Sequence, residues 1–309
     1  MPKKRITEQA LVIDHRTQLK ERDLIITLLC RNGTRRSAVV RSGARPGSKL
    51  AGACELLSDT SFLLAEGTNL DTVYEAELTA SFAAVRSDVL LFAASCVVCE
   101  LARKVGFRDL ENPFLYALTR AALACCANFA GHAGAACAAG HAGAVGDVRS
   151  VHAAGHVGAA GAQDPADPAD LTSYAMALVA AFAIKLCAHE GFLLEMGECV
   201  LCREALMQDV HQTAQLTSHP CAYSQNLYIS LEQGGVLCAS CAYGQEGLEC
   251  IDEATRVLMQ SLLMLRFQDI KNKDFNYAAL RSALRLSHIW AAHVFDARLY
   301  AFDFFESSL

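Results

Sequence analysis

The sequence predicts an α+β protein with a small N-terminal β-barrel or antiparallel sheet, followed by a helical body that contains a four-cysteine module. Three observations predict this class. Three short apolar and β-branched runs lie within the first 40 residues, apolar residues at helical spacing dominate from Ser81 onward, and two CxxC pairs lie 35 residues apart. The 309 residues, 53% of them apolar, suffice for two or three domains and exclude a wholly disordered chain.

The N-terminal module is expected to span residues 1–80. Three runs, at 10–13, 24–29 and 38–40, have strand character, and the Asn32-Gly33 pair between the second and third predicts a tight type I′ hairpin. Along the third strand, alternation places Arg35 and Arg41 on one face, so we expect both to project into solvent. Arg36 falls on the other face.

Charge is divided unevenly along the chain. The first 50 residues contain 12 Lys and Arg against 4 Asp and Glu, a balance of +8, whereas the remaining 259 residues carry −14, which together give the net −6. Such asymmetry indicates a polyanion-binding module on an acidic body, although a merely solvated basic face is the alternative. The candidate phosphate-contacting residues are Arg35, Arg36, Arg41, Arg45 and Lys49, the last two on a loop expected to be flexible.

Aromatic side chains are missing from the basic segment, because the first one in the chain is Phe62. Platforms for stacking bases are therefore absent there. We expect binding that is dominated by the phosphate backbone, strongly salt-dependent and weakly selective for sequence.

The body, at residues 81–309, is predicted to be helical, with one helix from about Ser81 to Val105 and another that starts at Pro113. A Gly/Ala/His-rich insert is expected at 128–170, where the histidines indicate either a metal-binding array or, more simply, a mobile segment of small residues. The apolar run around 174–188 contains Lys185 and predicts a buried helix rather than a membrane span.

The four cysteines of the CxxC pairs predict a structural zinc site. Cys199, Cys202, Cys238 and Cys241 lie in a module expected at 195–245, with a β-ribbon between the pairs. Two knuckles supply tetrahedral S4 coordination and leave no position for an activated water. A redox dithiol is the alternative. Cys96 and Cys99 form a third CxxC inside an apolar helical run and are interpreted as core thiols.

No enzyme motif is complete in this chain. The order of residues at Gly43 to Lys49 does not form a P-loop, Leu193 replaces the second histidine of a zincin motif that would begin at His189, and neither CxxC follows the proline of a zinc deaminase. Because its basic start is followed by only a few apolar residues and then by charge, we do not expect the N-terminus to be a secretory leader, and fourteen cysteines are typical of a reducing compartment. We therefore expect a cytoplasmic protein that is not an enzyme.

Several stretches, in order and spacing, are similar to a known family. They are Glu8 to Val12, Leu19 to Asp23, Ser42 to Arg45, Ser48 to Gly52, Glu75 to Phe82, Glu190 to Phe192 before the first knuckle, and Gly234 to Cys238. Together with the basic β-module and the four-cysteine knuckle they resemble the recombination mediator and DNA repair family RecO. The chain departs from the family pattern at Lys20, where a glycine is usual, and in the 128–170 insert.

The resemblance implies an N-terminal OB-fold that binds single- and double-stranded DNA, annealing of complementary strands, and help in loading the recombinase RecA. It implies RecR and the single-stranded-DNA-binding protein SSB as partners, and a cytoplasmic, nucleoid-associated location. Arg45 and Lys49 match the family's basic motif, and the four knuckle cysteines match its zinc ligands. Two other functions remain open, an RNA-binding OB and zinc-ribbon protein and a zinc-dependent nucleic-acid enzyme.

Overall fold

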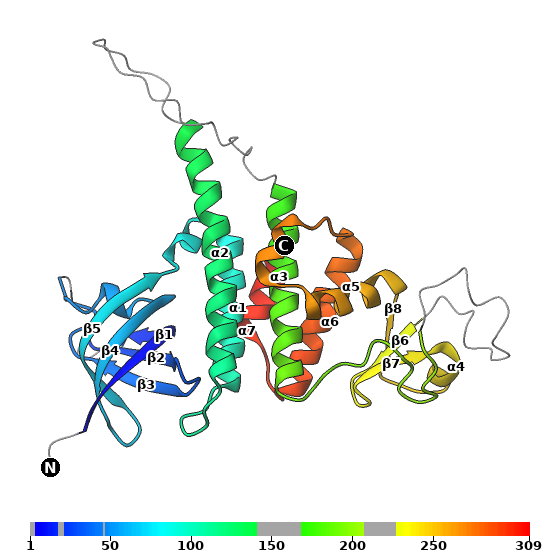
Figure 1. Cartoon of the computed structure of the whole chain (residues 1–309), viewed down its shortest axis with the longest axis horizontal. Coiled ribbons are helices and arrows are strands. Elements are labelled where there is room, and N and C mark those ends of the chain that lie inside the picture. Colours follow the sequence, from blue (N-terminus) through cyan, green and yellow to red (C-terminus); the bar gives the residue numbers. More distant parts are fainter. Residues whose placement is uncertain (1–3, 18–21, 46, 141–167, 207–226) are drawn as a thin grey trace, which may run out of the picture.

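The computed structural model describes residues 4–17, 22–45, 47–140, 168–206 and 227–309. A β-barrel, a group of helices and a small cysteine-containing module follow one another along the longest axis of the molecule (Figure 1). This order agrees with the predicted α+β class.

The N-terminal module is a closed five-stranded barrel. Its strands are β1 (Arg5–Thr17), β2 (Leu24–Cys30), β3 (Arg35–Val40), β4 (Ser58–Ala65) and β5 (Asp71–Ser81), and the short 3₁₀ helix η1 (Gly52–Cys54) precedes β4. The strands pair in the order β1-β2-β3-β5-β4 and β4 closes onto β1; all pairs are antiparallel except β3 with β5. This topology is that of an OB-fold, as expected.

The middle of strand β1, residues 10–13, is apolar on both faces because the barrel buries one face and the helical body buries the other. Ala10 and Val12 lie in the barrel core, whereas Leu11 and Ile13 pack into the core of the helical body. Alternation along a strand produces this division. The continuous apolar run at 10–13 is therefore a strand shared by two cores.

The hairpin between β2 and β3 is present, but the predicted type I′ turn is wrong. Only Gly33 has a positive φ, +84°, whereas a type I′ turn requires positive φ at Asn32 as well. The Cys30 N–H donates to the Thr34 carbonyl (2.9 Å), and the Gly33 N–H donates to the Cys30 carbonyl (2.7 Å), as in a three-residue loop that ends in a left-handed glycine. A Cβ on Gly33 would lie 1.8 Å from the Asn112 carbonyl oxygen, so the approach of the helical body requires glycine here.

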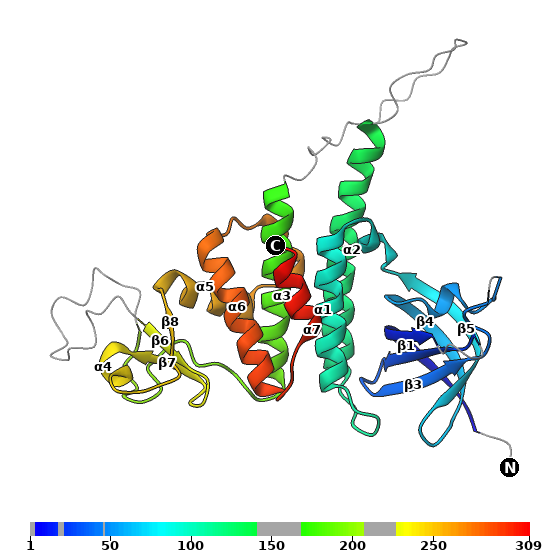
Figure 2. The same ribbon diagram turned by 180° about the vertical axis from the view of Figure 1, so that it is seen from behind.

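The helical body follows a 3₁₀ turn, η2 (Ala83–Ser87). Its helices are α1 (Val89–Val105), α2 (Pro113–Gly140), α3 (Pro168–His189), α5 (Glu253–Met264), α6 (Tyr277–Val294) and α7 (Tyr300–Ser307), with the 3₁₀ segment η4 (Phe267–Asn272) after α5. Figure 2 shows α7 beside α1. There the buried Glu100 carboxylate accepts the Tyr300 and Ala301 N–H groups (3.0 and 2.8 Å) and caps α7.

Helix α3 forms the centre of the body. Every side chain from Tyr174 to Ile184 is buried, because α1, α2, α5 and α6 surround the helix. Within the described residues, the segment 170–189 alone is long and apolar enough to cross a bilayer, and 72% of its most apolar window is buried in the fold. It is the buried core helix that the sequence predicted.

The expected limits of the Gly/Ala/His-rich insert are wrong at both ends. Helix α2 continues to Gly140, and α3 begins at Pro168. Ala130 is buried, and the Phe129 ring stacks on Tyr174 with centroids 4.2 Å apart, so packing against α3 extends the helix past residue 128. The remainder of the insert, 141–167, lies outside the described residues, as do the histidines at 141, 152 and 156.

The cysteine module contains a three-stranded sheet in the order β7-β6-β8. Its elements are β6 (Leu227–Ser230), β7 (Gly235–Cys238), the short helix α4 (Ala239–Ala242) and β8 (Glu249–Ile251). The predicted ribbon between the two knuckles corresponds to β6 and β7. Strand β8 extends the module beyond its predicted end at residue 245.

Candidate metal centre and nucleic-acid interface

The four predicted ligands meet in one cluster. The sulfur atoms of Cys199, Cys202, Cys238 and Cys241 all lie within 4.8 Å of one another. The Cys202 and Cys238 sulfurs are 3.9 Å apart, close to the edge of about 3.8 Å expected for a tetrahedron of sulfurs with 2.3 Å bonds to one ion. None of the four is disulfide-bonded. The donor set and its spacing therefore fit a tetrahedral metal ion.

The surroundings of Cys199 favour its thiolate form. Burial raises the pKa of this thiol, but backbone N–H groups of Cys202, Cys238 and Leu201 hydrogen-bond to the sulfur and lower the pKa to about 7. One of these contacts, from the Cys238 N–H, measures 3.4 Å. Donors to a thiolate stabilise the charged form that binds a metal.

The first knuckle is held against β7 by backbone contacts that Gly235 permits. The Glu195 carbonyl accepts from the Val236 N–H (2.9 Å), and the Val236 carbonyl accepts from the Val200 N–H (3.0 Å). A Cβ on Gly235 would lie 2.4 Å from the Val200 side chain, so the two segments approach this closely because the residue is glycine.

A buried arginine joins the module to the body. Arg256, on α5, donates to the Met196 carbonyl (2.6 Å) and pairs with Glu253. The Trp290 indole N–H, on α6, donates to the Phe192 carbonyl (3.2 Å) in the segment that leads to the first knuckle. The sequence patterns did not predict these two anchors, since each joins residues 60 or more positions apart.

The third CxxC belongs to the core and not to a metal site. Cys99 is buried, and burial raises the pKa of its thiol well above the ordinary value; Cys96, partly buried, has a pKa raised to about 11 by the same cause. Both thiols therefore stay protonated at neutral pH. The interpretation as core thiols agrees with these positions.

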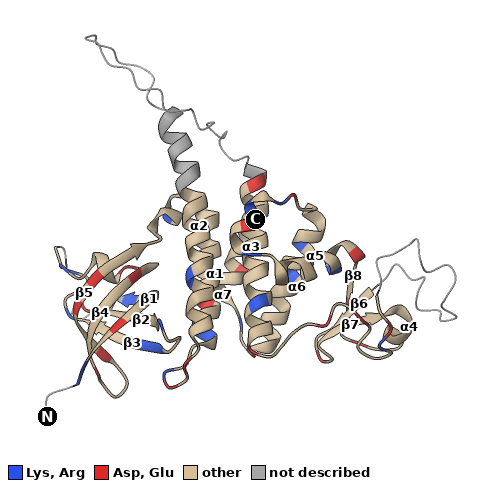
Figure 3. Cartoon of the chain, in the orientation of Figure 1, with Lys and Arg blue, Asp and Glu red and all other residues tan. Residues whose placement is uncertain are grey.

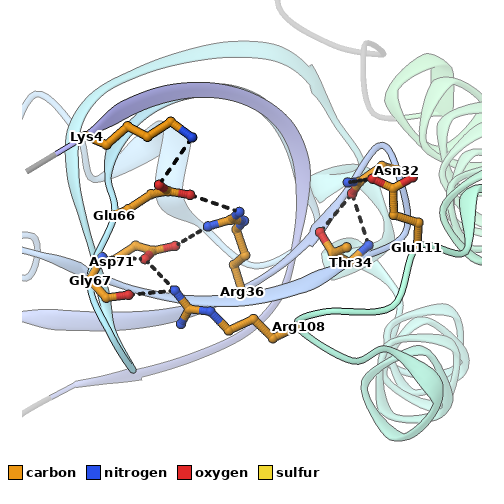
Figure 4. A network of polar contacts seen from close by, with 9 residues as sticks. All are labelled: Lys4, Asn32, Thr34, Arg36, Glu66, Gly67, Asp71, Arg108 and Glu111. Carbon is orange, nitrogen blue, oxygen red and sulfur yellow. Dashed lines mark hydrogen bonds and ion pairs between the residues drawn. The ribbon is translucent and has the colours of Figure 1, made fainter.

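Arg36 does not face solvent. Its side chain is 16% exposed and donates to Asp71, whose carboxylate is fully buried, at 3.1 Å; Glu66 lies 3.5 Å away (Figure 4). Asp71 also accepts from Arg108 of the α1–α2 linker (3.1 Å) and from the Gly67 N–H (2.9 Å). These carboxylates already neutralise the guanidinium, which makes Arg36 a poor phosphate ligand.

Arg35 is also engaged within the protein. Its guanidinium donates to the Arg103 carbonyl at the end of α1 (2.5 Å), and its backbone N–H donates to the Phe107 carbonyl (2.9 Å). The expectation that Arg35 and Arg41 project together into solvent is therefore wrong for Arg35. The helical body covers the start of β3, and the sequence pattern of the strand alone does not show this.

Arg41, Arg45 and Lys49 remain exposed. Among the described residues, no acidic side chain forms an ion pair with any of the three. The loop that carries them contains turns: the Arg45 N–H donates to the Ser42 carbonyl, and the Ser48 N–H donates to the Arg45 carbonyl (both 3.1 Å). Arg22, exposed on the adjacent β1–β2 loop, was not among the candidates.

Acidic and basic side chains lie on different parts of the barrel. Acidic residues mark β5 in Figure 3, and Glu75 and Glu77 are exposed on its outer surface. The cations at Arg22, Arg41, Arg45 and Lys49 lie instead on the loops where β2 begins and β3 ends, strands that pair there through Leu24 and Val40. We call these four residues the basic end of the barrel.

An OB-fold barrel with a basic end, joined to a helical body that carries a four-thiol module, defines the class of this protein. Residues 1–82 match the family model described as "Recombination protein O N terminal". The chain is 24% identical to a protein named DNA repair protein RecO from Dehalococcoides mccartyi, over 80% of this chain and 74% of that protein.

Shorter matches involve other proteins of the same name. The RecO proteins of Listeria welshimeri and Bacillus mycoides are each 28% identical over 35% of this chain, and the matches cover 42% and 43% of their lengths. The resemblance to the RecO family is confirmed: the barrel matches the model of that family's N-terminal domain, and the similarity to one RecO protein extends over 80% of the chain.

Proposed function

We propose that this protein is a DNA repair and homologous recombination mediator that binds single- and double-stranded DNA through the basic end of its barrel. The observation that carries the proposal is the group of exposed cations at Arg41, Arg45 and Lys49, without acidic partners among the described residues, on a RecO N-terminal domain. Each cation that meets a phosphate releases condensed counterions, so binding is independent of base sequence.

Strand annealing follows from the same electrostatics. A cationic surface lowers the repulsion between two phosphate backbones, and base pairing then supplies both the specificity and the driving force. No catalytic residue is required, and we propose no enzyme activity. By analogy with its relatives, the protein would act with RecR on SSB-coated single strands and help to load RecA, in the cytoplasm at the nucleoid.

Binding to a single-stranded oligonucleotide at several salt concentrations tests the DNA site. Replacing Arg41, Arg45 and Lys49 by alanine should weaken binding for every sequence and reduce the slope of log affinity against log salt by about 2, since each lost phosphate contact changes it by about 0.7. The matched control replaces three exposed cations of the body, Lys271, Lys273 and Arg281. An unchanged slope in the first variant would contradict the proposal, and preferential competition by RNA would favour an RNA-binding function.

We propose that the four-cysteine cluster holds one structural zinc ion. Zinc bound to Cys199, Cys202, Cys238 and Cys241 would stabilise the fold of the module, and four sulfur ligands leave no position for a reactive water. This proposal rests on the S4 donor set and on the N–H groups directed at the Cys199 sulfur.

A serine substitution tests the metal site. Cys238→Ser should abolish stoichiometric metal, whereas Cys250→Ser, an exposed cysteine of the same module outside the cluster, should retain it. The absorption spectrum of the cobalt-substituted protein should show S4 ligation. Because metal and protons compete for the same thiolates, metal content should fall as the pH is lowered, and an ion held by four sulfurs should stay bound to a pH below the pKa of about 7 that Cys199 has without metal. Equal metal content in both variants would exclude this site.

A further inference from the structure

The two loops at the basic end of the barrel are joined to each other. The Asp23 carboxylate oxygen Oδ1 accepts a hydrogen bond from the Ser42 N–H at 2.6 Å, and the Arg22 carbonyl accepts one from the Ala44 N–H at 3.0 Å. Both bonds cross from the loop before β2 to the loop after β3. Residues that are about 20 positions apart in the chain therefore form one unit.

Backbone strain accompanies these two bonds. Arg22 and Ser42 have φ values of +55° and +53°, a left-handed conformation that residues other than glycine rarely adopt. Such conformations persist where the surrounding contacts hold them. Gly43 is equally confined, since a Cβ there would lie 2.9 Å from the Val40 side chain.

The joined loops place the cations of the basic end together. Arg41 immediately precedes Ser42, whose N–H donates to the Asp23 carboxylate. The Arg45 N–H donates to the Ser42 carbonyl and so forms the next turn. Arg22 stands on the opposite loop directly beside Asp23 and is exposed, and no described acidic residue forms an ion pair with it. Two bonds therefore fix the position of Arg22 relative to Arg41 and Arg45, and the Asp23 carboxylate makes the only one of the two that a side-chain substitution can remove.

We propose that Arg22 is a further phosphate-contacting residue and that Asp23 is the positioning residue that holds the basic end in its DNA-binding arrangement through the Ser42 N–H. The proposal rests on the proposed DNA-binding function. Asp23 is an acidic residue directly beside these cations, and its negative charge opposes phosphate binding. Charge alone therefore predicts that its removal strengthens binding, whereas positioning predicts the reverse.

Substitutions at Asp23 in the full-length, metal-loaded protein separate these two effects. Asp23→Ala removes both the charge and the acceptor, and we expect five- to tenfold weaker binding of a single-stranded oligonucleotide. Asp23→Asn removes the charge but keeps an oxygen for the Ser42 N–H, so it should bind as tightly as the wild type or more tightly. Asp23→Glu keeps the charge but moves the acceptor by one methylene, and should weaken binding even if the alanine variant does not fold.

Arg22→Ala completes the test. It should reduce the salt slope by about 0.7, the effect of one lost phosphate contact on a single strand. Wild-type or tighter binding by both Asp23→Ala and Asp23→Glu would overturn the positioning role, and an unchanged slope in Arg22→Ala would overturn the phosphate contact. The Arg41, Arg45 and Lys49 triple variant distinguishes failure of this inference from failure of DNA binding itself: if the triple variant binds like the wild type, the DNA site is wrong.

Discussion

Arginines that look alike in the sequence have different surroundings in the structure. Arg36 and Arg41 are five positions apart, yet Arg36 is paired with two carboxylates and Arg41 is exposed. Strand alternation does indicate the difference, because Arg36 shares a face with Ala38 and Val40, which lie in the barrel core. The partner Asp71, 35 residues away, is known only from the fold.

We expect Arg36→Ala to affect stability rather than DNA binding. The substitution leaves the buried Asp71 carboxylate with only part of its hydrogen bonds, which should lower the free energy of unfolding by about 2–3 kcal/mol. The salt slope of DNA binding should not change. Urea unfolding and salt titration measure the two effects. Arg41→Ala is the matched control. It should reduce the salt slope of DNA binding but leave the free energy of unfolding within about 0.5 kcal/mol of the wild type.

At the scale of elements, a single backbone contact sets how the β2–β3 turn packs against the linker before α2. Gly33 ends the β2–β3 turn and lies against Asn112, whose N–H donates to the Asn32 carbonyl (2.9 Å) just before α2. The sequence predicted a hairpin here because Asn-Gly favours turns. It did not predict the turn type, since the approach of the linker before α2 also acts on this loop.

Two glycine substitutions separate backbone strain from steric contact. Gly33 and Gly47 both have φ near +80°, but a Cβ at Gly47 would meet nothing within 4 Å. Gly47→Ala should therefore cost only the left-handed conformation, about 1 kcal/mol. Gly33→Ala must also displace Asn112 and should cost at least about 2 kcal/mol more. Equal midpoints of urea unfolding for the two variants would show that the barrel and the linker before α2 are not in close contact.

At the scale of the whole molecule, a buried carboxylate joins the barrel to the helical body. Asp59 of β4 is 2% exposed and accepts from Gln9 of β1 (2.5 Å), from the Tyr116 hydroxyl of α2 (3.0 Å) and from Arg120 of α2 (2.8 Å). Burial, and then the Asp59 charge, raise the pKa of Tyr116 to about 12, so its hydroxyl remains a donor at physiological pH.

We expect Asp59→Ala to uncouple the unfolding of the two parts. It should lower stability by about 2–3 kcal/mol, because Tyr116 and Arg120 lose their acceptor, whereas Tyr116→Phe should cost about 1 kcal/mol. Fluorescence of Trp290, the single tryptophan, reports on the body, and hydrogen exchange of barrel peptides reports on the barrel. In the wild type, the Trp290 fluorescence and the hydrogen exchange of the barrel should change at the same urea concentration. In Asp59→Ala the barrel should unfold at a lower urea concentration than the body. Coincident transitions in the variant would show that Asp59 does not couple the parts.

The sequence by itself determined the α+β class, the first three strands of the barrel, the buried helix at α3 and the four cysteines of the candidate metal site. Each of these depends on local spacing: alternation, helical periodicity, or the two-residue separation that lets a knuckle present two sulfurs to one ion. Only the tertiary structure decided which arginines are free, where α2 ends and how Asp23 joins two loops. Those features depend on contacts between residues far apart in the chain, which the local pattern around each residue does not contain.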